Sequence, residues 1–228
     1  KQPHQHTPFF WDILKESKIE NILIDLLGKD ISLKTSKLNT KAPGGGAAVE
    51  WHQDWAFYPH TNDNVLALGL MINDVDFDNG PLMVIPKSHK GPVLSHNNNG
   101  VFCGAIDPND KNFDISKAVT LTGKARSMTI HHARTLHGSA PNNSNKDRLM
   151  LFYECNSADA WPLVGVGAYL NNTNPIDLCN QMERQMLCGN VSYQPRMESV
   201  PVVLPLPPAP DHGSIFTTQK TGGAKSAF

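Results

Sequence analysis

The sequence predicts a mainly β fold, a sandwich or barrel with a few flanking helices, and three observations support this prediction. Beyond residue 48 the apolar runs are short and are separated by turn residues. Regular helical periodicity does not recur between these runs. The length of 228 residues is typical of one large all-β domain. We therefore expect a single domain over residues 1–228.

Helical elements are expected near both ends of the chain. The segment WDILKESKIENILIDLLG, residues 11–28, has apolar residues at helical intervals, and Gly28 is a natural helix end. The following segment, DISLKTSKLNTK, indicates a strand, and APGGGAAV is a flexible connection. A second helix is expected from Pro175 to Leu187, with Pro at its start and Gly189 just beyond its end.

The remaining strands follow from short apolar runs. They are expected at Val49 to Tyr58, Val65 to Ile72, Pro81 to Ile85, Val119 to Leu121, Ser127 to His132 and Leu149 to Glu154. Two irregular segments, Gly91 to Lys117 and Ala158 to Asn174, are longer than ordinary connections, so they are candidate binding loops. The Pro-rich C-terminal extension, about residues 194–228, is expected to start as extended chain and to end in a poorly ordered segment, TQKTGGAKSAF.

The composition restricts the possible partners. The net charge is −1 and the basic residues form no stripe, which argues against nucleic acid or an anionic membrane as the main partner. No apolar run approaches the roughly 20 residues of a membrane helix. The four cysteines are scattered without a C-x-x-C pair, which favours a reducing intracellular compartment such as the cytoplasm. The chain begins without Met, so we expect that some N-terminal residues are missing; the oligomeric state cannot be predicted.

One strand carries polar residues where apolar ones are expected. In AVEWHQDWAFYP, residues 48–59, His52 and Asp54 are two apart, so in a strand they point to the same side. Burying both is costly unless a ligand requires them. His137, in HHARTLHGSAPN, can add a second imidazole. Two histidines and one carboxylate on one face of a metal leave three positions open, as in non-haem Fe(II) oxygenases.

An arginine supplies the second part of this hypothesis. A 2-oxo acid that chelates iron leaves its distal carboxylate to be anchored, and a guanidinium does this with two hydrogen bonds. Arg148 lies 11 residues after His137, on the strand that follows a polar turn. Ser139 can add a hydroxyl to the same carboxylate. The predicted cofactors are therefore Fe(II) and 2-oxoglutarate, with O₂ as cosubstrate.

Four motifs, in this order, carry a family resemblance: WHQDW, NGPLMVIPKSHKG, HHARTLHGSAPNNS and RLMLFYE. Together they resemble the phytanoyl-CoA dioxygenase family of Fe(II)- and 2-oxoglutarate-dependent oxygenases. The resemblance implies a double-stranded β-helix, or jelly-roll, with the metal held inside one end. It also implies that His52, Asp54 and His137 are the iron ligands and Arg148 the 2-oxoglutarate anchor, with Gln53 and Ser139 as further cosubstrate contacts.

The implied function is hydroxylation, desaturation or ring closure at an unactivated C–H bond of a small molecule, with release of succinate and CO₂. Trp55 and His132 are the candidates for substrate contact, although at most one of His131 and His132 faces the cavity. The alternative is a metal-binding jelly-roll, a cupin-type isomerase or ligand-binding module that does not activate O₂. Such a protein has no need of the 2-oxo acid anchor, which favours the oxygenase interpretation.

Overall fold

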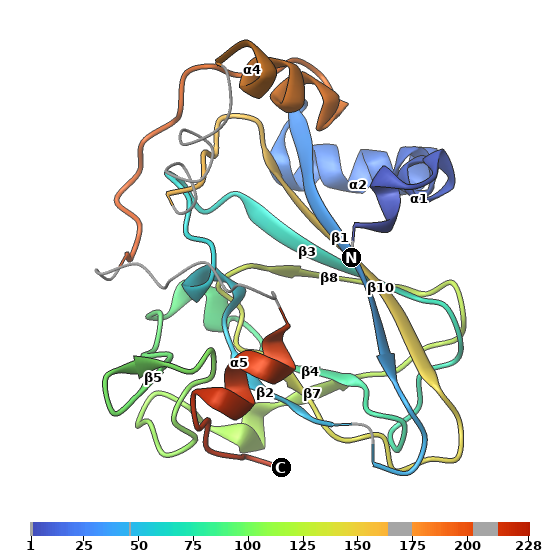
Figure 1. Ribbon diagram of the computed structural model, residues 1–228, viewed down its shortest axis with the longest axis vertical. Helices are drawn as coiled ribbons and strands as arrows, with labels where there is room; N and C mark the ends of the chain where they lie inside the picture. The colour runs from blue at the N-terminus through green and yellow to red at the C-terminus, as the bar shows by residue number, and fades with distance from the viewer. Residues whose placement is uncertain (1, 46, 164–174, 203–213) are drawn as a thin grey trace.

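The structure, a computed structural model, describes residues 2–45, 47–163, 175–202 and 214–228 (Figure 1). Its two main sheets are antiparallel, so the predicted mainly β fold is confirmed. The larger sheet has the strand order β11-β1-β10-β3-β8. Its strands are β1 (Ile31–Lys41), β3 (Val65–Met71), β8 (Met128–His132), β10 (Arg148–Ser157) and β11 (Met186–Cys188).

The smaller sheet holds the residues on which the functional hypothesis depends. Its order is β2-β9-β4-β7. Its strands are β2 (Val49–His52), β4 (Leu82–Val84), β7 (Val119–Leu121) and β9 (His137–Ser139). A separate hairpin of β5 (Asn97–Asn98) and β6 (Val101–Phe102) lies in the long segment after Gly91. Asn99 and Gly100 both have positive φ at its turn, the conformation that favours an Asn-Gly pair in tight hairpins.

The N-terminal helix is broken where the sequence predicts one helix. It consists of α1 (Pro8–Asp12), a short 3₁₀ turn (Ile13–Lys15) and α2 (Ser17–Leu27). Glu16 takes an extended ψ of 127° and separates the two helices, and the backbone N–H of Gly28 closes α2 as expected. The helices cover the large sheet through Leu14, Leu23 and Leu27. These leucines pack with strand residues into the main apolar core: Ile31, Leu33, Leu66, Leu68, Leu151, Tyr153, Cys155 and Leu187.

The strand that carries the histidine and aspartate is shorter than predicted. It ends at His52, and Asp54–Ala56 form a 3₁₀ turn instead of continuing to Tyr58. Gln53 keeps an extended conformation, with φ −121° and ψ 127°. Because Gln53 is extended, the side chains of His52 and Asp54 still point to the same side, although only His52 belongs to the ladder.

The C-terminal part differs most from the prediction. The expected helix ends at Arg184 (α4, Pro175–Arg184), and β11 follows it. The first four residues of TQKTGGAKSAF, the segment expected to be poorly ordered, instead end a helix, α5 (Ile215–Thr221), which lies beside β2 in Figure 1. Residues 164–174 and 203–213, which include most of one predicted loop and part of the Pro-rich extension, lie outside the described residues. Among the described helices, none combines the length and apolar character that crossing a bilayer requires.

Candidate metal and cosubstrate site

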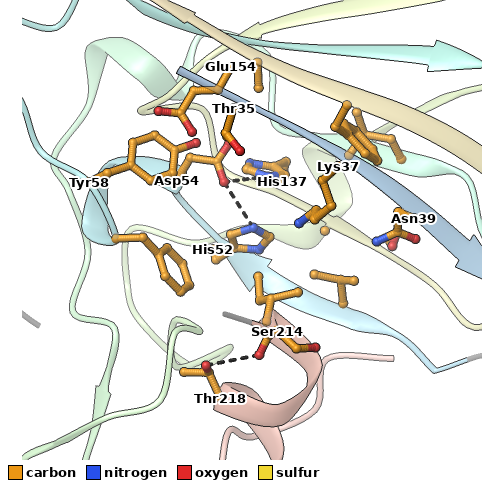
Figure 2. A pocket seen from close by; sticks show the side chains of 18 of the residues that line it. Thr35, Lys37, Asn39, His52, Asp54, Tyr58, His137, Glu154, Ser214 and Thr218 are labelled. Atoms are coloured by element: carbon orange, nitrogen blue, oxygen red, sulfur yellow. Dashed lines mark hydrogen bonds and ion pairs between the residues drawn. The ribbon is translucent and has the colours of Figure 1, made fainter. Parts of the chain in front are cut away.

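The structure brings the three predicted metal ligands together. His52 is the last residue of β2 and His137 is the first of β9, and the two lie opposite each other in the antiparallel ladder. The Nε2 atoms of His52 and His137 are 3.6 and 3.7 Å from Oδ1 of Asp54. All three potential ligand atoms lie within 4.8 Å of one another, so the group could hold one metal ion (Figure 2).

Hydrogen bonds fix both histidines in the form that a metal requires. Nδ1 of His52 is 2.8 Å from the carbonyl of Glu50, and Nδ1 of His137 is 2.9 Å from the carbonyl of Thr135. A carbonyl only accepts, so each Nδ1 must carry the proton. Each Nε2 is then left with a free lone pair directed at Asp54, which is the tautomer of a metal-ligating histidine. The donor set therefore fits a divalent metal such as Fe(II).

The electrostatics of the group also suit a cation. Burial alone would raise the pKa of Asp54, but the imidazoles of His137, His131 and His52 hold this pKa well below its usual range. Burial, together with the neighbouring His52, lowers the pKa of His137 well below its ordinary value. The carboxylate is thus charged and the imidazole neutral at physiological pH, as metal binding demands.

A fourth residue, His131 of β8, belongs to the same cluster. Its Nε2 lies 3.6 Å from Oδ2 of Asp54, the oxygen that does not face the other two histidines. The residue is buried, and neither ring nitrogen has a hydrogen-bond partner among the described residues. The sequence carried a signal for it: Met128 and Ile130 pack on the helix-covered core, so His131 must point to the opposite face of β8.

Arg148 is placed as a carboxylate anchor would be. It begins β10, opposite Lys41 in the ladder with β1, and it is 3% exposed. Its Nη2 donates to Oδ1 of Asn39 at 3.2 Å, while its Nε has no partner among the described residues. Burial lowers the pKa of Arg148 to about 10, so the guanidinium stays charged near neutrality. A buried guanidinium without a carboxylate partner is costly, and the distal carboxylate of 2-oxoglutarate would relieve that cost.

Of the two further cosubstrate candidates, only Ser139 lies in the cavity. Ser139 is buried beside the Arg148 end, where its carbonyl accepts a hydrogen bond from the Lys41 ammonium at 3.0 Å. Gln53 points to the opposite side from His52, as strand alternation requires. Its amide donates to the carbonyls of Pro92 and Arg134 and accepts from a backbone N–H, so it fixes loops rather than facing the cavity. The prediction that Gln53 contacts cosubstrate does not fit this geometry.

The two substrate-contact candidates also lie away from the cavity. The Trp55 side chain is buried in a small apolar cluster with Val65, and its indole donates to the carbonyl of Pro201. His132 faces Asp63, with its Nε2 3.8 Å from the carboxylate, on the other side of β8 from His131. Neither residue contributes to the described wall of the cavity. His132 alternates with His131 along β8 and so points to the opposite face, whereas Trp55 lies in the 3₁₀ turn and packs on the apolar cluster.

A cavity of about 660 Å³ surrounds the cluster and reaches Arg148. Figure 2 shows His52 and Asp54 in its middle, Tyr58 and Glu154 at one end, and Ser214 and Thr218 of the C-terminal segment at the other. The sequence reasoning missed three sets of wall residues. They are Thr35, Lys37 and Asn39 on β1, Tyr58 and Glu154 at the end away from the C-terminal segment, and Ser214, Ile215, Thr217, Thr218 and Thr221 of that segment.

Comparison with known proteins agrees with this chemistry. The family model described as phytanoyl-CoA dioxygenase (PhyH) matches residues 1–150. A probable alpha-ketoglutarate-dependent hypophosphite dioxygenase of Stutzerimonas stutzeri is 39% identical over 224 residues, covering 96% of this chain and 74% of that protein. The ectoine dioxygenase of Bordetella bronchiseptica is 24% identical over 181 residues, covering 68% of this chain and 56% of that protein.

Solved structures show the same fold. SnoN, a non-haem alpha-ketoglutarate-dependent epimerase from nogalamycin biosynthesis, has a TM-score of 0.60 at 19% identity, covering 89% of this chain and 73% of SnoN. EctD from S. alaskensis, solved with 2-oxoglutarate and 5-hydroxyectoine, has a TM-score of 0.56 at 24% identity. That match covers 68% of this chain and 54% of EctD, so the chain spans little more than half of this neighbour. The expected jelly-roll core is thereby confirmed.

Proposed function

The chain belongs to the phytanoyl-CoA dioxygenase family of Fe(II)- and 2-oxoglutarate-dependent oxygenases, and from this premise we propose that it inserts oxygen into a bond to hydrogen in a small polar substrate. The observation that carries the proposal is that one cavity holds both the His52, Asp54 and His137 cluster and Arg148, whose guanidinium has no carboxylate partner among the described residues. In this proposal the three clustered residues hold Fe(II). Bound Fe(II) supplies the oxidation by O₂, coupled to conversion of 2-oxoglutarate to succinate and CO₂.

The roles of the protein groups follow from their positions. The Glu50 and Thr135 carbonyls hold the two imidazoles so that each Nε2 faces the metal position. Arg148 binds the distal carboxylate of 2-oxoglutarate, and Asn39 keeps the guanidinium oriented toward the cavity. The ligand set leaves positions for a chelating 2-oxo acid and for O₂. The cupin-type alternative has no use for a buried arginine that lies 11 residues beyond the second histidine and has no carboxylate partner among the described residues.

The first substrate to test is hypophosphite. The relative named for hypophosphite is 39% identical over 96% of this chain, and its match extends through residues that the ectoine dioxygenase match does not cover. The reaction would place one oxygen atom of O₂ into a P–H bond, giving phosphite, and the other into succinate. The reduction of O₂ takes four electrons, two from hypophosphite and two from 2-oxoglutarate, so no protein group is oxidised.

A second candidate is hydroxylation of a C–H bond in a small organic zwitterion, and the size of the cavity favours it. The cavity has a volume of about 660 Å³. Hypophosphite and 2-oxoglutarate together have only thirteen non-hydrogen atoms. The test is to incubate the protein with Fe(II), 2-oxoglutarate and either hypophosphite or ectoine, and to measure succinate and the oxidised product.

For hypophosphite, we expect succinate and phosphite in equal amounts, with neither formed when 2-oxoglutarate is omitted. Succinate release stimulated by ectoine and not by hypophosphite would favour the C–H candidate. If neither compound nor the 2-oxo acid alone gives succinate, although the metal binds, the site belongs to the metal-binding alternative.

A further inference from the structure

One cationic side chain in the cavity is not used by the metal or by its predicted cosubstrate. Thr35, Lys37 and Asn39 alternate along β1, so their side chains share the face that lines the cavity. Figure 2 shows Lys37 between His52 and Asn39. Its ammonium makes no hydrogen bond or ion pair with any described residue. Lys37 is exposed to solvent and also lines the cavity, so its ammonium is available to an anionic group that enters the cavity.

The charges around the metal position favour this interpretation. Fe(II), the Asp54 carboxylate, the 2-oxoglutarate dianion and the Arg148 guanidinium sum to zero charge. Lys37 then adds one positive charge to the wall. Glu154, the second acid among the described wall residues, pairs with Thr35 in the ladder and forms no ion pair with Lys37. Its carboxyl group lies beside the Tyr58 hydroxyl in Figure 2. These four charges balance one another, so the positive charge of Lys37 is not needed to neutralise them and can serve a further ligand.

The wall contributed by the C-terminal segment carries hydroxyls and no acid. Ser214, Thr217, Thr218 and Thr221 line the same cavity as Lys37, and α5 has no acidic residue. Gln219 fixes this helix: its amide donates to the carbonyls of Glu50 and Gly104, and it accepts from the Glu50 N–H at 3.0 Å. The α5 wall is therefore a neutral hydrogen-bonding surface that does not repel an anion.

Lys37 is too far along β1 to serve the carboxylate that Arg148 would hold. Asn39 is the residue that contacts Arg148, and Lys37 lies two positions further along the strand. Two strand residues span about 6.6 Å, so the ammonium emerges one side-chain row away from the arginine. That row lies nearer the end marked by Tyr58 and Glu154, because Thr35, two residues before Lys37, pairs with Glu154 in the ladder.

We propose that Lys37 is the recognition group for an anionic substrate, binding its negatively charged oxygens while the bond to be oxidised faces the metal. This inference rests on the proposed function and deepens it, because it names the substrate class as small oxyanions or molecules with an anionic group. It also predicts that Lys37 acts on substrate binding and has little effect on metal or 2-oxoglutarate binding.

The experiment is a calorimetric titration in two steps, with Mn(II) replacing Fe(II) so that no turnover occurs. First, 2-oxoglutarate is added to the Mn(II)-loaded protein; then hypophosphite is added to that complex. The variants are Lys37→Met, Lys37→Arg and the control Lys220→Met, which changes an exposed lysine on α5 outside the cavity wall. Loss of one charge-assisted contact is worth about tenfold or more in affinity.

We expect Lys37→Met to weaken hypophosphite binding by about tenfold or more, with 2-oxoglutarate affinity within about twofold of the wild type. Lys37→Arg is expected to restore most of the affinity, and Lys220→Met to match the wild type. Hypophosphite binding that is unchanged in Lys37→Met, or absent in the wild type, would overturn the proposal. So would a loss confined to 2-oxoglutarate binding. If the proposed function itself is wrong, the result differs from all of these, because 2-oxoglutarate then does not bind to the Mn(II)-loaded wild type in the first step.

Discussion

Replacing Arg148 with methionine tests the cosubstrate anchor by removing a charge from a buried position. Methionine keeps most of the length of the stem and leaves no new polar atom in the cavity wall. Arg148 has no carboxylate partner among the described residues, so the substitution breaks no ion pair there. The fold should therefore tolerate it, since replacing a buried charge by an apolar group of similar size is often neutral.

The expected effect on 2-oxoglutarate can be estimated from the geometry. Arg148 is 3% exposed, and its Nε has no partner among the described residues, so it can donate to a carboxylate. Truncating one partner of a buried, hydrogen-bonded charge pair costs about 2–5 kcal/mol. At about 1.4 kcal/mol per decade, the dissociation constant should rise by roughly 30-fold to a few thousand-fold. Arg148→Lys should recover only part of this loss, because an ammonium cannot form the two parallel hydrogen bonds.

The assay is calorimetric titration of 2-oxoglutarate into the Mn(II)-loaded protein, with metal affinity measured separately by electron paramagnetic resonance. The matched control is Arg126→Met, at an exposed arginine remote from the cavity wall. Metal affinity should be similar in all three proteins. If Arg148→Met binds 2-oxoglutarate as tightly as the wild type, the anchor assignment is refuted.

Three further predictions follow from the same geometry. Asp54→Ala removes the carboxylate shared by the histidines, so Mn(II) binding and succinate formation should both be lost; tight Mn(II) binding in this variant would contradict the ligand assignment. Gln219→Ala removes the hydrogen bond from α5 to the Glu50 carbonyl, which also orients His52, so the affinity for Mn(II) should fall severalfold. The control Lys220→Ala should leave this affinity unchanged. If Gln219→Ala binds Mn(II) as tightly as the wild type, Gln219 has a structural role only. Burial lowers the pKa of His60 to about 4, so between pH 6.5 and 4 only the unfolded chain binds a proton at this residue. The free energy of unfolding should therefore fall by roughly 3 kcal/mol as the pH is lowered through this range. Urea titrations should show that His60→Gln reduces this loss, and an unchanged pH dependence would exclude His60 as its source.

Much of the metal site could be predicted from the sequence because it depends on local spacing. His52 and Asp54 share a side through strand alternation, and the extended Gln53 preserves this even though the strand ends early. The same alternation places Gln53 and His132 on the side away from the cavity. The family resemblance alone does not indicate to which side a side chain points. His131 could have been chosen over His132 from the apolar positions Met128 and Ile130.

The C-terminal wall could not be predicted because its order depends on tertiary contacts. The segment TQKTGGAKSAF has little apolar character, and short helices of this kind are marginal on their own. It is held by the Gln219 hydrogen bonds, by close packing of Gly222 on Cys103, and by stacking of Phe228 on Trp51. At Gly222 a Cβ would lie 2.5 Å from the Cys103 Cα, so only glycine fits without displacement. None of these partners is near in sequence.

The most direct test of the central claim is the fate of O₂ in the metal-loaded protein. The protein is supplied with Fe(II), 2-oxoglutarate, hypophosphite and ¹⁸O₂, and the succinate is analysed by mass spectrometry. The account predicts one ¹⁸O atom in each succinate, with succinate absent in Asp54→Ala. Succinate that carries no label, or that forms equally without Fe(II), would contradict the claim that this cavity is a 2-oxoglutarate-dependent oxygenase site.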